Sequence, residues 1–371
     1  MSASAQPVAA RLAPYYVELR RGQRYAWCAC GRSRNQPYCD GSHAGTGIEP
    51  LRQTAPATAE VLLCGCKRTG TPPFCDGSHN SLVGVYGTDD PDSPANRAIE
   101  LIGFGGSGKA LVDGGCFVGH VDHAGGVDHA DAADAGRWQR HGALAWRTLV
   151  GRGDGAHHQA LFCFDLPPGH SPPIAFGDRQ TALLFTAADA VLAIGSRRFA
   201  VRAAAGVEVG ASVRPGETFA IENRGATPLR IHVAVGPLAD APLWPSALGE
   251  HFDDRYPERI APVDPAQRHA MAERYFQVLV SHAHGAHDLT QFIGEIPPSK
   301  ATPHRHLYEE TLIVLAGRGM LWTETRKAPV TAGDIIFLPR KQLHSLQCTG
   351  PEPMQLVGVI HPGDNPSINY Y

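Results

Sequence analysis

Six of the nine cysteines lie between residues 28 and 75, and they recur at a fixed interval. The segment that begins at Cys28 reads CACGRSRNQPYCDGSH, and the segment that begins 36 residues later, at Cys64, reads CGCKRTGTPPFCDGSH. Such a gap-free repeat indicates a duplicated module. The chemically active residues of the two copies are Cys28, Cys30, Cys39 and His43, and Cys64, Cys66, Cys75 and His79.

Three thiolates and one imidazole in each copy form a closed set of metal ligands. Soft thiolates select zinc or iron–sulfur clusters, and one histidine in place of a cysteine raises the potential of a cluster and adds a ligand that can be protonated. A Cys3His zinc site is the alternative. Zinc sites usually open with cysteines roughly two to four residues apart, whereas each copy here opens with C-x-C. The spacing therefore favours an iron–sulfur cluster.

Both copies resemble the CDGSH iron–sulfur motif, C-x-C-x2-(S/T)-x3-P-x-C-D-G-(S/T)-H, at all its defined positions. The resemblance implies one [2Fe–2S] cluster per copy, and so two clusters in the chain. It also implies that the C-x-C cysteines hold the inner iron, while Cys39 with His43, or Cys75 with His79, hold the outer and more exposed iron. Two copies in one chain resemble the tandem, monomeric branch of that family rather than its membrane-anchored dimers.

A second group of metal-ligating residues lies in the C-terminal third of the chain. His304 and His306 point to the same face of a strand because side chains alternate with period two, and Glu310 keeps that parity. The segment from Gly333 is followed by His344. Three imidazoles and a carboxylate suit Fe(II), Mn, Ni or Zn, and they leave open positions for oxygen or substrate.

The spacing H-x-H-x3-E-x6-G, followed by G-x5-P-x4-H, resembles the cupin superfamily of small jelly-roll barrels. The resemblance implies a mononuclear divalent metal, taken here as Fe(II), held by the three histidines and Glu310. Pro298 and Lys341 stand where the family usually has glycine, which affects turns rather than ligands. A metal-free cupin retained for packing is the alternative.

Residues 166–189 look like a degenerate copy of the same pattern. The segment LPPGHSPP at Leu166 aligns with IPPSKATP at Ile296, at an offset of 130 residues. This alignment predicts a bicupin with an inert N-terminal barrel, because the positions of the four ligands are occupied by Ile174, Phe176, Gln180 and Thr227.

The segments around these motifs are predicted to be strands. From about residue 155, short apolar runs alternate with Gly/Pro turns, which is typical of a β-sandwich or barrel. Residues 264–275 are predicted to be helical and to bridge two β-domains. Gly103–Ala110 has P-loop spacing, but Ala110 replaces the Ser/Thr that would hold Mg²⁺, so a glycine-rich hairpin is predicted instead of a nucleotide site. The histidines 120, 123 and 129 are interpreted as surface-loop residues, with a metal site as the alternative.

The predicted fold class is mainly β: two cupin jelly-roll barrels preceded by a small tandem CDGSH module. The predicted boundaries are 1–82 for the module, 83–150 for a linker and β-rich extension, 151–240 for the degenerate barrel, 241–274 for a connection with a helix, and 275–371 for the metal-binding barrel.

Composition excludes several classes of function. The chain of 371 residues carries a net charge of −3, which argues against a general nucleic-acid or membrane-surface binder. No apolar run reaches the ~18 residues of a membrane span, and the first 14 residues lack the apolar region of a secretory signal. Without a signal, many cysteines favour metal binding in a reducing compartment, and we expect a cytoplasmic protein.

The two kinds of metal pattern predict a cupin oxygenase or oxidase of a small molecule, supplied with electrons by its own clusters. The expected partners are a small-molecule substrate, O2 and an external reductase. Gln291, His282 and His284 precede the histidine motif and are candidate catalytic residues. One alternative is a redox sensor or cluster-transfer protein with an effector-binding cupin. Another is a cupin isomerase or thiol dioxygenase with structural clusters.

Overall fold

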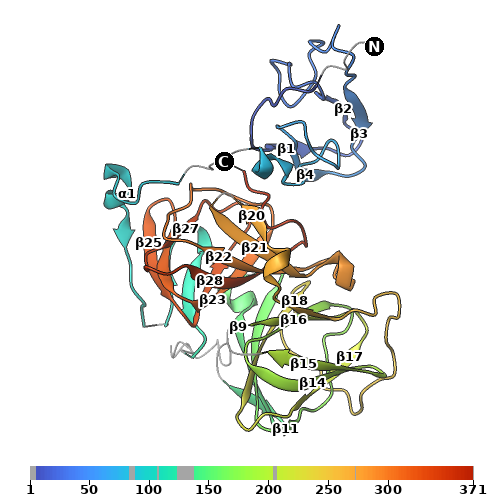
Figure 1. Ribbon diagram of the computed structural model, residues 1–371, viewed down its shortest axis with the longest axis vertical. Coiled ribbons are helices and arrows are strands. Elements are labelled where there is room, and N and C mark those ends of the chain that lie inside the picture. The colour runs from blue at the N-terminus through green and yellow to red at the C-terminus, as the bar shows by residue number, and fades with distance from the viewer. Residues whose placement is uncertain are drawn as a thin grey trace.

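The computed structural model describes residues 6–82, 88–106, 108–122, 138–203, 207–271 and 273–370. Three parts follow one another along the long axis of the molecule (Figure 1). The N-terminal module lies at one end, the C-terminal barrel in the middle and the N-terminal barrel at the other end. The module therefore lies next to the barrel that contains most of the C-terminal third of the chain. The chain is mainly β, as the sequence predicts.

The N-terminal module contains two small antiparallel sheets, and each takes one strand from either copy of the repeat. One sheet pairs β1 (Tyr15–Leu19) with β4 (Ala59–Leu63), and the other pairs β2 (Arg24–Trp27) with β3 (Leu51–Thr54). Bridges between Trp27 and Tyr38 and between Leu63 and Phe74 repeat at the 36-residue offset. Because the strands are exchanged, the two copies form one folding unit around a shared core that includes Trp27 and Leu63.

The N-terminal barrel consists of a seven-stranded and a five-stranded sheet. The larger sheet has the order β19-β16-β13-β18-β10-β9-β8, with the bounds β8 Gln139–His141, β9 Leu144–Val150, β10 Ala160–Leu166, β13 Gln180–Phe185, β16 Val209–Val213, β18 Leu229–Gly236 and β19 Ile260–Pro262. The smaller sheet contains β11 Gly169–His170, β12 Ile174–Ala175, β14 Ala188–Ile194, β15 Arg197–Ala203 and β17 Thr218–Asn223.

The C-terminal barrel pairs an eight-stranded sheet with a four-stranded one. The larger sheet has the order β20-β21-β22-β28-β23-β26-β7-β6, with the bounds β6 Ala110–Leu111, β7 Phe117–His120, β20 His269–Met271, β21 Arg274–Val280, β22 Thr290–Ile296, β23 Glu309–Ala316, β26 Asp334–Leu338 and β28 Met354–His361. The smaller sheet contains β5 Glu100–Leu101, β24 Arg318–Trp322, β25 Arg326–Thr331 and β27 Ser345–Cys348.

Two expectations about the connecting segments are wrong. Residues 83–150 are not an extension, because β5, β6 and β7 complete the C-terminal barrel while β8 and β9 belong to the N-terminal barrel. The helix expected over 264–275 is a single 3-10 turn, η4 (Pro265–Gln267), capped by Asp264. The chain then forms a hairpin of β20 and β21, because pairing His269 with Phe276 satisfies the backbone that a longer helix would have used.

The remaining helices are short: α1 Pro94–Ala98, η1 Ser78–Ser81, η2 Asp113–Gly115, η3 Arg152–Asp154 and η5 His282–His284. No described helix is long and apolar enough to cross a membrane. In the glycine-rich stretch, Gly105 N–H donates to Lys109 O, and the Lys109 ammonium pairs with Asp154. His120 ends β7, whereas residues 123 and 129 lie outside the described ranges.

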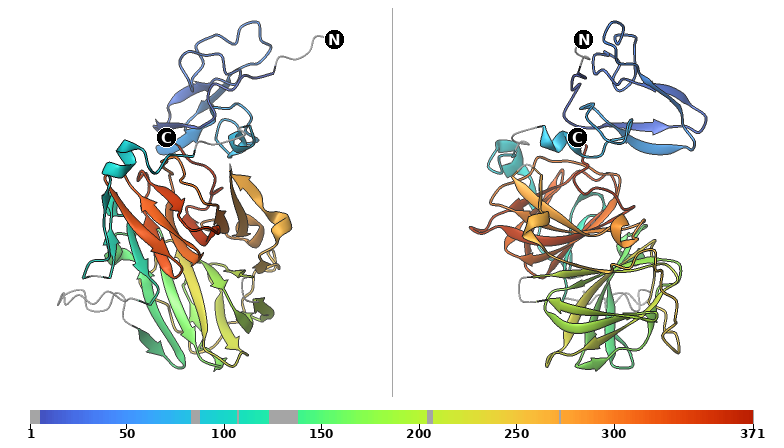
Figure 2. Two further views of the ribbon diagram at one scale, coloured as in Figure 1. Left: turned by 60° about the vertical axis from the view of Figure 1, so that its left-hand side comes forward. Right: turned by 45° about the vertical axis from the view of Figure 1, so that its right-hand side comes forward.

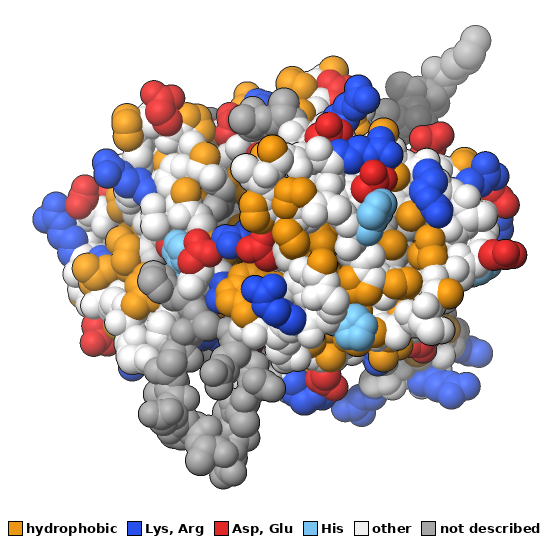
Figure 3. Space-filling model, turned by 90° about the horizontal axis from the view of Figure 1, so that it is seen from below, with side chains coloured by type: hydrophobic (Ala, Val, Ile, Leu, Met, Phe, Trp, Pro, Cys, Tyr) orange, Lys and Arg blue, Asp and Glu red, His pale blue; other side chains and the backbone are white. Residues whose placement is uncertain are grey.

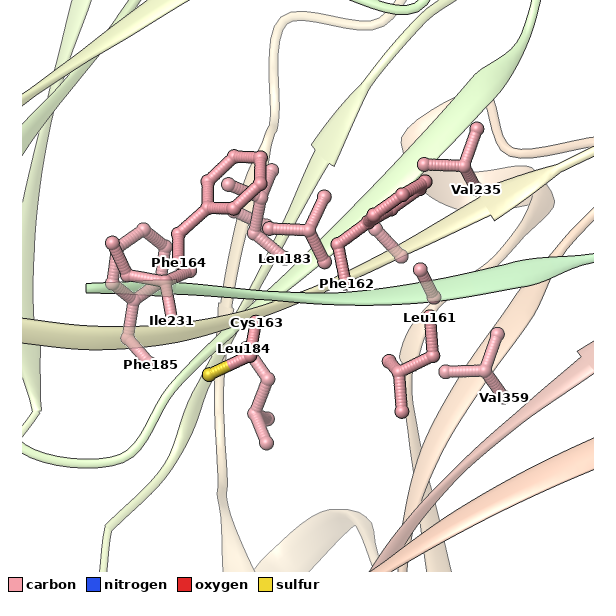
Figure 4. Close-up of a cluster of buried hydrophobic side chains, with 14 of the residues drawn as sticks. Leu161, Phe162, Cys163, Phe164, Leu183, Leu184, Phe185, Ile231, Val235 and Val359 are labelled. Carbon is pink, nitrogen blue, oxygen red and sulfur yellow. The ribbon is translucent and has the colours of Figure 1, made fainter. Parts of the chain in front are cut away.

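The two barrels pack through their large sheets around one continuous core. This cluster contains the interior of the N-terminal barrel and also Ile293, Ile313 and Val359 from the outer face of the C-terminal barrel. Figure 4 shows Leu161 of β10 beside Val359 of β28. A second cluster fills the inside of the C-terminal barrel. At the far end of the N-terminal barrel, acidic and basic side chains are interspersed over the surface (Figure 3).

One buried carboxylate fastens the barrels to each other. Glu309 accepts hydrogen bonds from the backbone N–H groups of His157, His158 and Gln159, at 3.0, 3.2 and 3.0 Å. The Gln159 amide in turn donates to Glu309 O and Val359 O, both at 3.1 Å. Since hydrogen bonds to a charged group are among the stronger ones, this contact fixes a loop of one barrel on a strand of the other.

We expect Glu309→Gln to lower the free energy of unfolding by about 1–3 kcal/mol, because the charge is lost and the amide nitrogen faces backbone donors, of which the N–H of the buried Gln159 is left without an acceptor. Urea unfolding followed by tryptophan fluorescence measures the loss. The control is Glu352→Gln, whose parent side chain is exposed. An equal midpoint for the two variants would contradict the role of Glu309.

A pH dependence follows from His232 on β18. Burial, and secondarily the charges of Arg230 and Arg147, lower its pKa to about 4, and neither ring nitrogen has a hydrogen-bond partner among the described residues. In the unfolded chain the pKa is about 6.5. Because only the unfolded chain binds this proton between those values, stability falls as the pH falls from about 6.5 to about 4.

We expect His232→Leu to flatten this dependence, since it removes the group that is protonated on unfolding. Urea midpoints measured between about pH 7 and pH 4.5 test the expectation. His170→Leu is the control, because His170 is exposed. The same slope in wild type and His232→Leu would show that other groups cause the dependence.

Candidate metal centres

The structure brings His304, His306, Glu310 and His344 together inside the C-terminal barrel. His304 and His344 pair through backbone hydrogen bonds of 3.0 and 3.1 Å, which places their rings 4.6 Å apart. Glu310 projects inward from β23, and its Oε2 lies 3.1 Å from His306 Nε2. The ligand atoms of His306, Glu310 and His344 all lie within 4.8 Å of one another. The ring of His304 lies outside this group of three, 4.6 Å from the His344 ring and 6.5 Å from the His306 ring.

Backbone carbonyls orient the three imidazoles. The Nδ1 atoms of His304, His306 and His344 lie 2.9, 2.8 and 2.9 Å from the carbonyl oxygens of Thr302, Tyr308 and Gln342. A carbonyl only accepts, so each Nδ1 carries the proton and each Nε2 offers its lone pair. The buried Nε2 of His306 has no hydrogen-bond partner. This unpaired acceptor fits a divalent metal.

Burial favours the neutral form of His304 and His344. Burial lowers the pKa of His304 to about 3, and burial lowers the pKa of His344 well below its usual range. Neutral imidazole is the form that binds a metal. The donor set of nitrogen and carboxylate oxygen therefore fits Fe(II), Mn, Ni or Zn.

The site opens into a cavity of about 630 Å³, a volume that includes its open mouth. Most of its lining is apolar. Besides the four ligand residues, it is lined by Met271, Arg274, Tyr275, Phe276, Phe292, Gly294, Glu295, Ile296, Tyr308, Leu312, Leu346, Leu356, Pro366 and Asn369.

The three candidate catalytic residues do not line this cavity. Gln291 is buried on the outer face of β22, where a Cβ at Gly210 of the other barrel would lie 2.8 Å from its Oε1. Phe292 and Ile296 point inward instead, because side chains alternate along the strand. His282 and His284 lie in η5, and His282 Nδ1 is 2.9 Å from His287 Nδ1 outside the barrel.

Sequence reasoning missed Arg274, Pro366 and Asn369. Arg274 lies in the segment that was expected to be helical. Read as a strand, the same segment places Arg274 and Phe276, two residues apart, on one face of β21, and this period of two could have identified Arg274. Pro366 and Asn369 lie in the C-terminal segment after β28, where no periodicity predicts that the chain returns to the cavity.

In the N-terminal barrel, the positions aligned with the ligands are part of the packing. Ile174 and Phe176 are buried in the main core. Gln180 is buried and its amide donates to Ser212 Oγ and Val213 O. Thr227 O accepts from Asn223 Nδ2. These residues offer no donor set comparable with that of the C-terminal barrel.

In the N-terminal module, the four ligand residues of each copy form two close pairs. In the first copy, the Sγ atoms of Cys28 and Cys30 are 3.7 Å apart, and Cys39 Sγ is 3.1 Å from His43 Nδ1. In the second copy, the corresponding distances are 3.5 Å for Cys64 and Cys66 and 3.4 Å for Cys75 and His79.

The pairing distinguishes two kinds of metal site. Around one tetrahedral zinc with Zn–S bonds of about 2.3 Å, all four ligand atoms would lie within roughly 4 Å of one another. Among the described residues, the ligand atoms of neither copy gather into one cluster of three as those of His306, Glu310 and His344 do. Two pairs of ligands suit two metal ions, as in a [2Fe–2S] cluster, so the donor set and its arrangement fit that group. In the second copy, the hydrogen bond between Cys64 and Cys66 lowers the pKa of Cys64 to about 6 and raises the pKa of Cys66, so it favours one thiolate of this pair.

The two copies differ in their surroundings. His43 is partly exposed, and its Nε2 lies 3.5 Å from the exposed carboxylate of Glu49. His79 is only 2% exposed, and burial lowers its pKa. The first site therefore faces solvent, and the second is enclosed.

Comparisons with known proteins match two parts of the chain. Residues 292–360 match the family model "Cupin domain", and residues 11–44 match "Iron-binding zinc finger CDGSH type". The CDGSH match covers the first copy of the repeat. A CDGSH domain implies an iron–sulfur cluster, and the cupin domain agrees with the His/Glu site described above.

Curated relatives match short stretches only. The mitochondrial CDGSH iron-sulfur domain-containing protein 3 of Mus musculus is 53% identical over 56 residues, which are 15% of this chain and 41% of that protein. Auxin-binding protein 1 of Arabidopsis thaliana is 30% identical over 96 residues, which are 23% of this chain and 48% of that protein. The chain thus covers less than half the length of these relatives.

Among solved structures, procruciferin, an 11S globulin from Brassica napus, superimposes with a TM-score of 0.51. The sequences are 10% identical, and the match covers 62% of this chain and 83% of that one. This likeness concerns the fold alone, and it agrees with the two jelly-roll barrels.

Replacing His306 or His344 by alanine should remove the mononuclear metal, because each takes away one of the inward-facing donors. We expect a loss of affinity greater than the roughly 10- to 100-fold that an outer-shell partner contributes. Elemental analysis per chain measures the loss, and the visible absorption of the iron–sulfur module should stay unchanged.

Gln291→Ala and His282→Ala are matched controls, since both parent residues lie outside the cavity. They should keep a full complement of mononuclear metal. Full occupancy in His306→Ala and His344→Ala as well would place the metal elsewhere.

Proposed function

We propose that this protein is a metal-dependent oxidoreductase, an oxygenase or oxidase of a small molecule. In this proposal His304, His306, Glu310 and His344 hold Fe(II), and the two Cys3His sites hold [2Fe–2S] clusters that deliver electrons to it. Fe(II) would supply oxygen activation, and the clusters would store and pass single electrons. The observation that carries the proposal is a continuous contact between the second Cys3His site and the cupin cavity.

The C-terminal segment 364–370 forms the first half of this contact. Asn365 Nδ2 donates to the carbonyl oxygen of Asp76, 3.1 Å away, and Asn80 Nδ2 donates to that of Ser367, 3.2 Å away. Asp76 directly follows Cys75 in the sequence, and Asn80 directly follows His79. Figure 2 shows the C-terminus at the junction of module and barrel.

The same segment reaches the metal site on its other side. Tyr308 Oη donates to the carbonyl oxygen of Pro366 at 2.9 Å, and the Tyr308 ring stacks on the His306 ring at 4.0 Å with an interplanar angle of 14°. Arg305, next to His306, pairs with Tyr370 through two backbone hydrogen bonds of 2.8 Å. Hydrogen bonds and packed rings thus join His79 and Cys75 to His306 through one short segment.

A comparison of equivalent glycines shows that the ligand loop of the second copy packs against the C-terminal segment, whereas the first copy meets that segment through Tyr16, whose ring stacks on Tyr370. A Cβ on Gly77 would lie 2.7 Å from Ser367 Oγ, whereas a Cβ on Gly41 would have nothing within 4 Å. The first copy keeps its partly exposed His43 toward solvent. This difference supports a direction of transfer, from an external reductase to the first cluster, then to the second, and then to the cupin metal.

The cavity residues complete the site. The three imidazoles and the Glu310 carboxylate would hold the metal, and the apolar side chains of Phe292, Leu312 and Leu356 would limit the access of water to it. Tyr308 is fully buried, and burial raises the pKa of its hydroxyl well above the usual range, so it keeps its proton. Its role in this proposal is to hold His306 and the C-terminal segment in contact.

Metal analysis after anaerobic purification tests the composition. The proposal requires about four cluster irons and one further metal per chain, with EPR signals from reduced clusters after dithionite treatment. Zinc in place of all iron would exclude it.

The electron path gives a sharper prediction. With Fe(III) in the cupin site and clusters reduced anaerobically, the high-spin Fe(III) signal should decay together with the signal of the reduced clusters. Tyr308→Phe should slow this decay at unchanged cluster content, because it removes the hydrogen bond to Pro366. Freeze-quench EPR measures both signals.

Tyr25→Phe is the matched control, since Tyr25 donates to Gln53 Oε1 at 2.8 Å within the module and away from the path. If the reduced clusters do not reduce the cupin iron in wild type, the result favours one of the alternative functions: a redox sensor, a cluster-transfer protein, or a cupin enzyme with structural clusters. If Tyr308→Phe transfers electrons as fast as wild type, the path through the C-terminal segment is wrong.

A further inference from the structure

The cavity above the cupin ligands contains a single lysine or arginine among its described lining residues. Arg274 is the first residue of β21, and its side chain reaches the same space as His304 and His344. The surrounding side chains are mostly apolar, with Phe276, Phe292 and several aliphatic residues. A cation in such a place requires a partner, because burying a charge in apolar surroundings is costly.

The protein satisfies this guanidinium only in part. Arg274 is 8% exposed, and its Nη2 donates to Leu346 O at 2.8 Å. Its buried Nε has no hydrogen-bond partner among the described residues and forms only a long ion pair, 3.7 Å, with Glu273 Oε1. Burial lowers the pKa of Arg274 to about 10, so the group is still a cation at neutral pH.

The other charged residues of the cavity are engaged elsewhere. Glu295 pairs with Arg268 at 3.3 Å, and Glu310 Oε2 lies 3.1 Å from His306 Nε2 among the metal ligands. Neither carboxylate therefore neutralises Arg274. A buried and incompletely paired guanidinium beside a metal site, above apolar walls, is suited to one anionic group on an otherwise apolar ligand.

We propose that the cavity binds an apolar carboxylic acid and that Arg274 is the residue that recognises its carboxylate. A planar guanidinium matches the planar carboxylate in shape and charge. One arginine, already near Glu273, suits a monoanion better than a doubly charged phosphate. The apolar part of the ligand would lie against Phe276, Phe292 and Leu356. This inference rests on the proposed function, because it identifies the substrate class of the same site.

The test is a comparison of matched ligands on the intact protein with Mn(II) in the cupin site, under anaerobic conditions. The probes are 3-phenylpropanoate and its neutral amide, 3-phenylpropanamide, which have nearly the same shape. A charge-assisted hydrogen bond should make the acid bind at least about tenfold tighter by isothermal titration calorimetry. Equal affinity of acid and amide for wild type would overturn the proposal without any variant.

Two variants assign the preference to Arg274 rather than to the metal. Arg274→Met should bring the affinities for the acid and the amide to within about threefold of each other. Arg274→Lys should retain part of the preference for the acid, because lysine keeps the positive charge but lacks the planar, forked donors of the guanidinium. Arg268→Met is the matched control, since Arg268 pairs with Glu295 and does not line the cavity, and it should keep the preference. A full preference in Arg274→Met, with its metal content unchanged, would show that the metal alone recognises the acid.

Failure of this inference can be distinguished from failure of the proposed function. The binding measurement needs no oxygen and no reduced cluster, so acid binding without electron transfer to the cupin iron would remove only the proposed oxidoreductase activity. Electron transfer to the cupin iron, with no preference for the acid, would remove only the assignment of Arg274.

Discussion

Two neighbouring carboxylates, Glu309 and Glu310, point to opposite faces of β23, and the rest of the architecture depends on this alternation. Glu310 enters the barrel and meets His306. Glu309 leaves it and accepts three backbone hydrogen bonds from the other barrel. Because side chains of a strand alternate with period two, the metal site and the barrel interface are fixed in register by the same strand.

The cupin cavity is also built from segments that lie far apart in the sequence. The large sheet of the C-terminal barrel is completed by β6 and β7, which precede the other barrel in sequence. Its cavity is also lined by Pro366 and Asn369, which lie close to the C-terminal end of the sequence. The metal-binding barrel is therefore assembled from two separate stretches, residues 100–120 and 269–370, and its closure couples the folding of both.

The N-terminal module uses duplication differently. Its two copies exchange strands, so that β1 pairs with β4 and β2 with β3, and they share one core. The ligand pairs of the copies are nearly equal in geometry but unequal in surroundings, because only the second copy is covered by the segment around Ser367. Docking on the barrel makes two similar sites into one exposed and one enclosed site.

The sequence alone determined the mainly β fold, the repeat and its ligand residues, and the four residues that meet in the C-terminal barrel, because each depends on residue type and on short, regular spacing. It predicted that Gln291 faces the cavity and that residues 264–275 form a helix, and both predictions are wrong. Which face of a strand lies inside a barrel, and whether a segment pairs as a hairpin, depend on contacts with residues far away in the sequence. Arg274 and the C-terminal segment became neighbours of the metal site only in the tertiary structure. The physical reason is that local periodicity specifies which way a side chain can point, whereas packing of distant strands decides what it meets there.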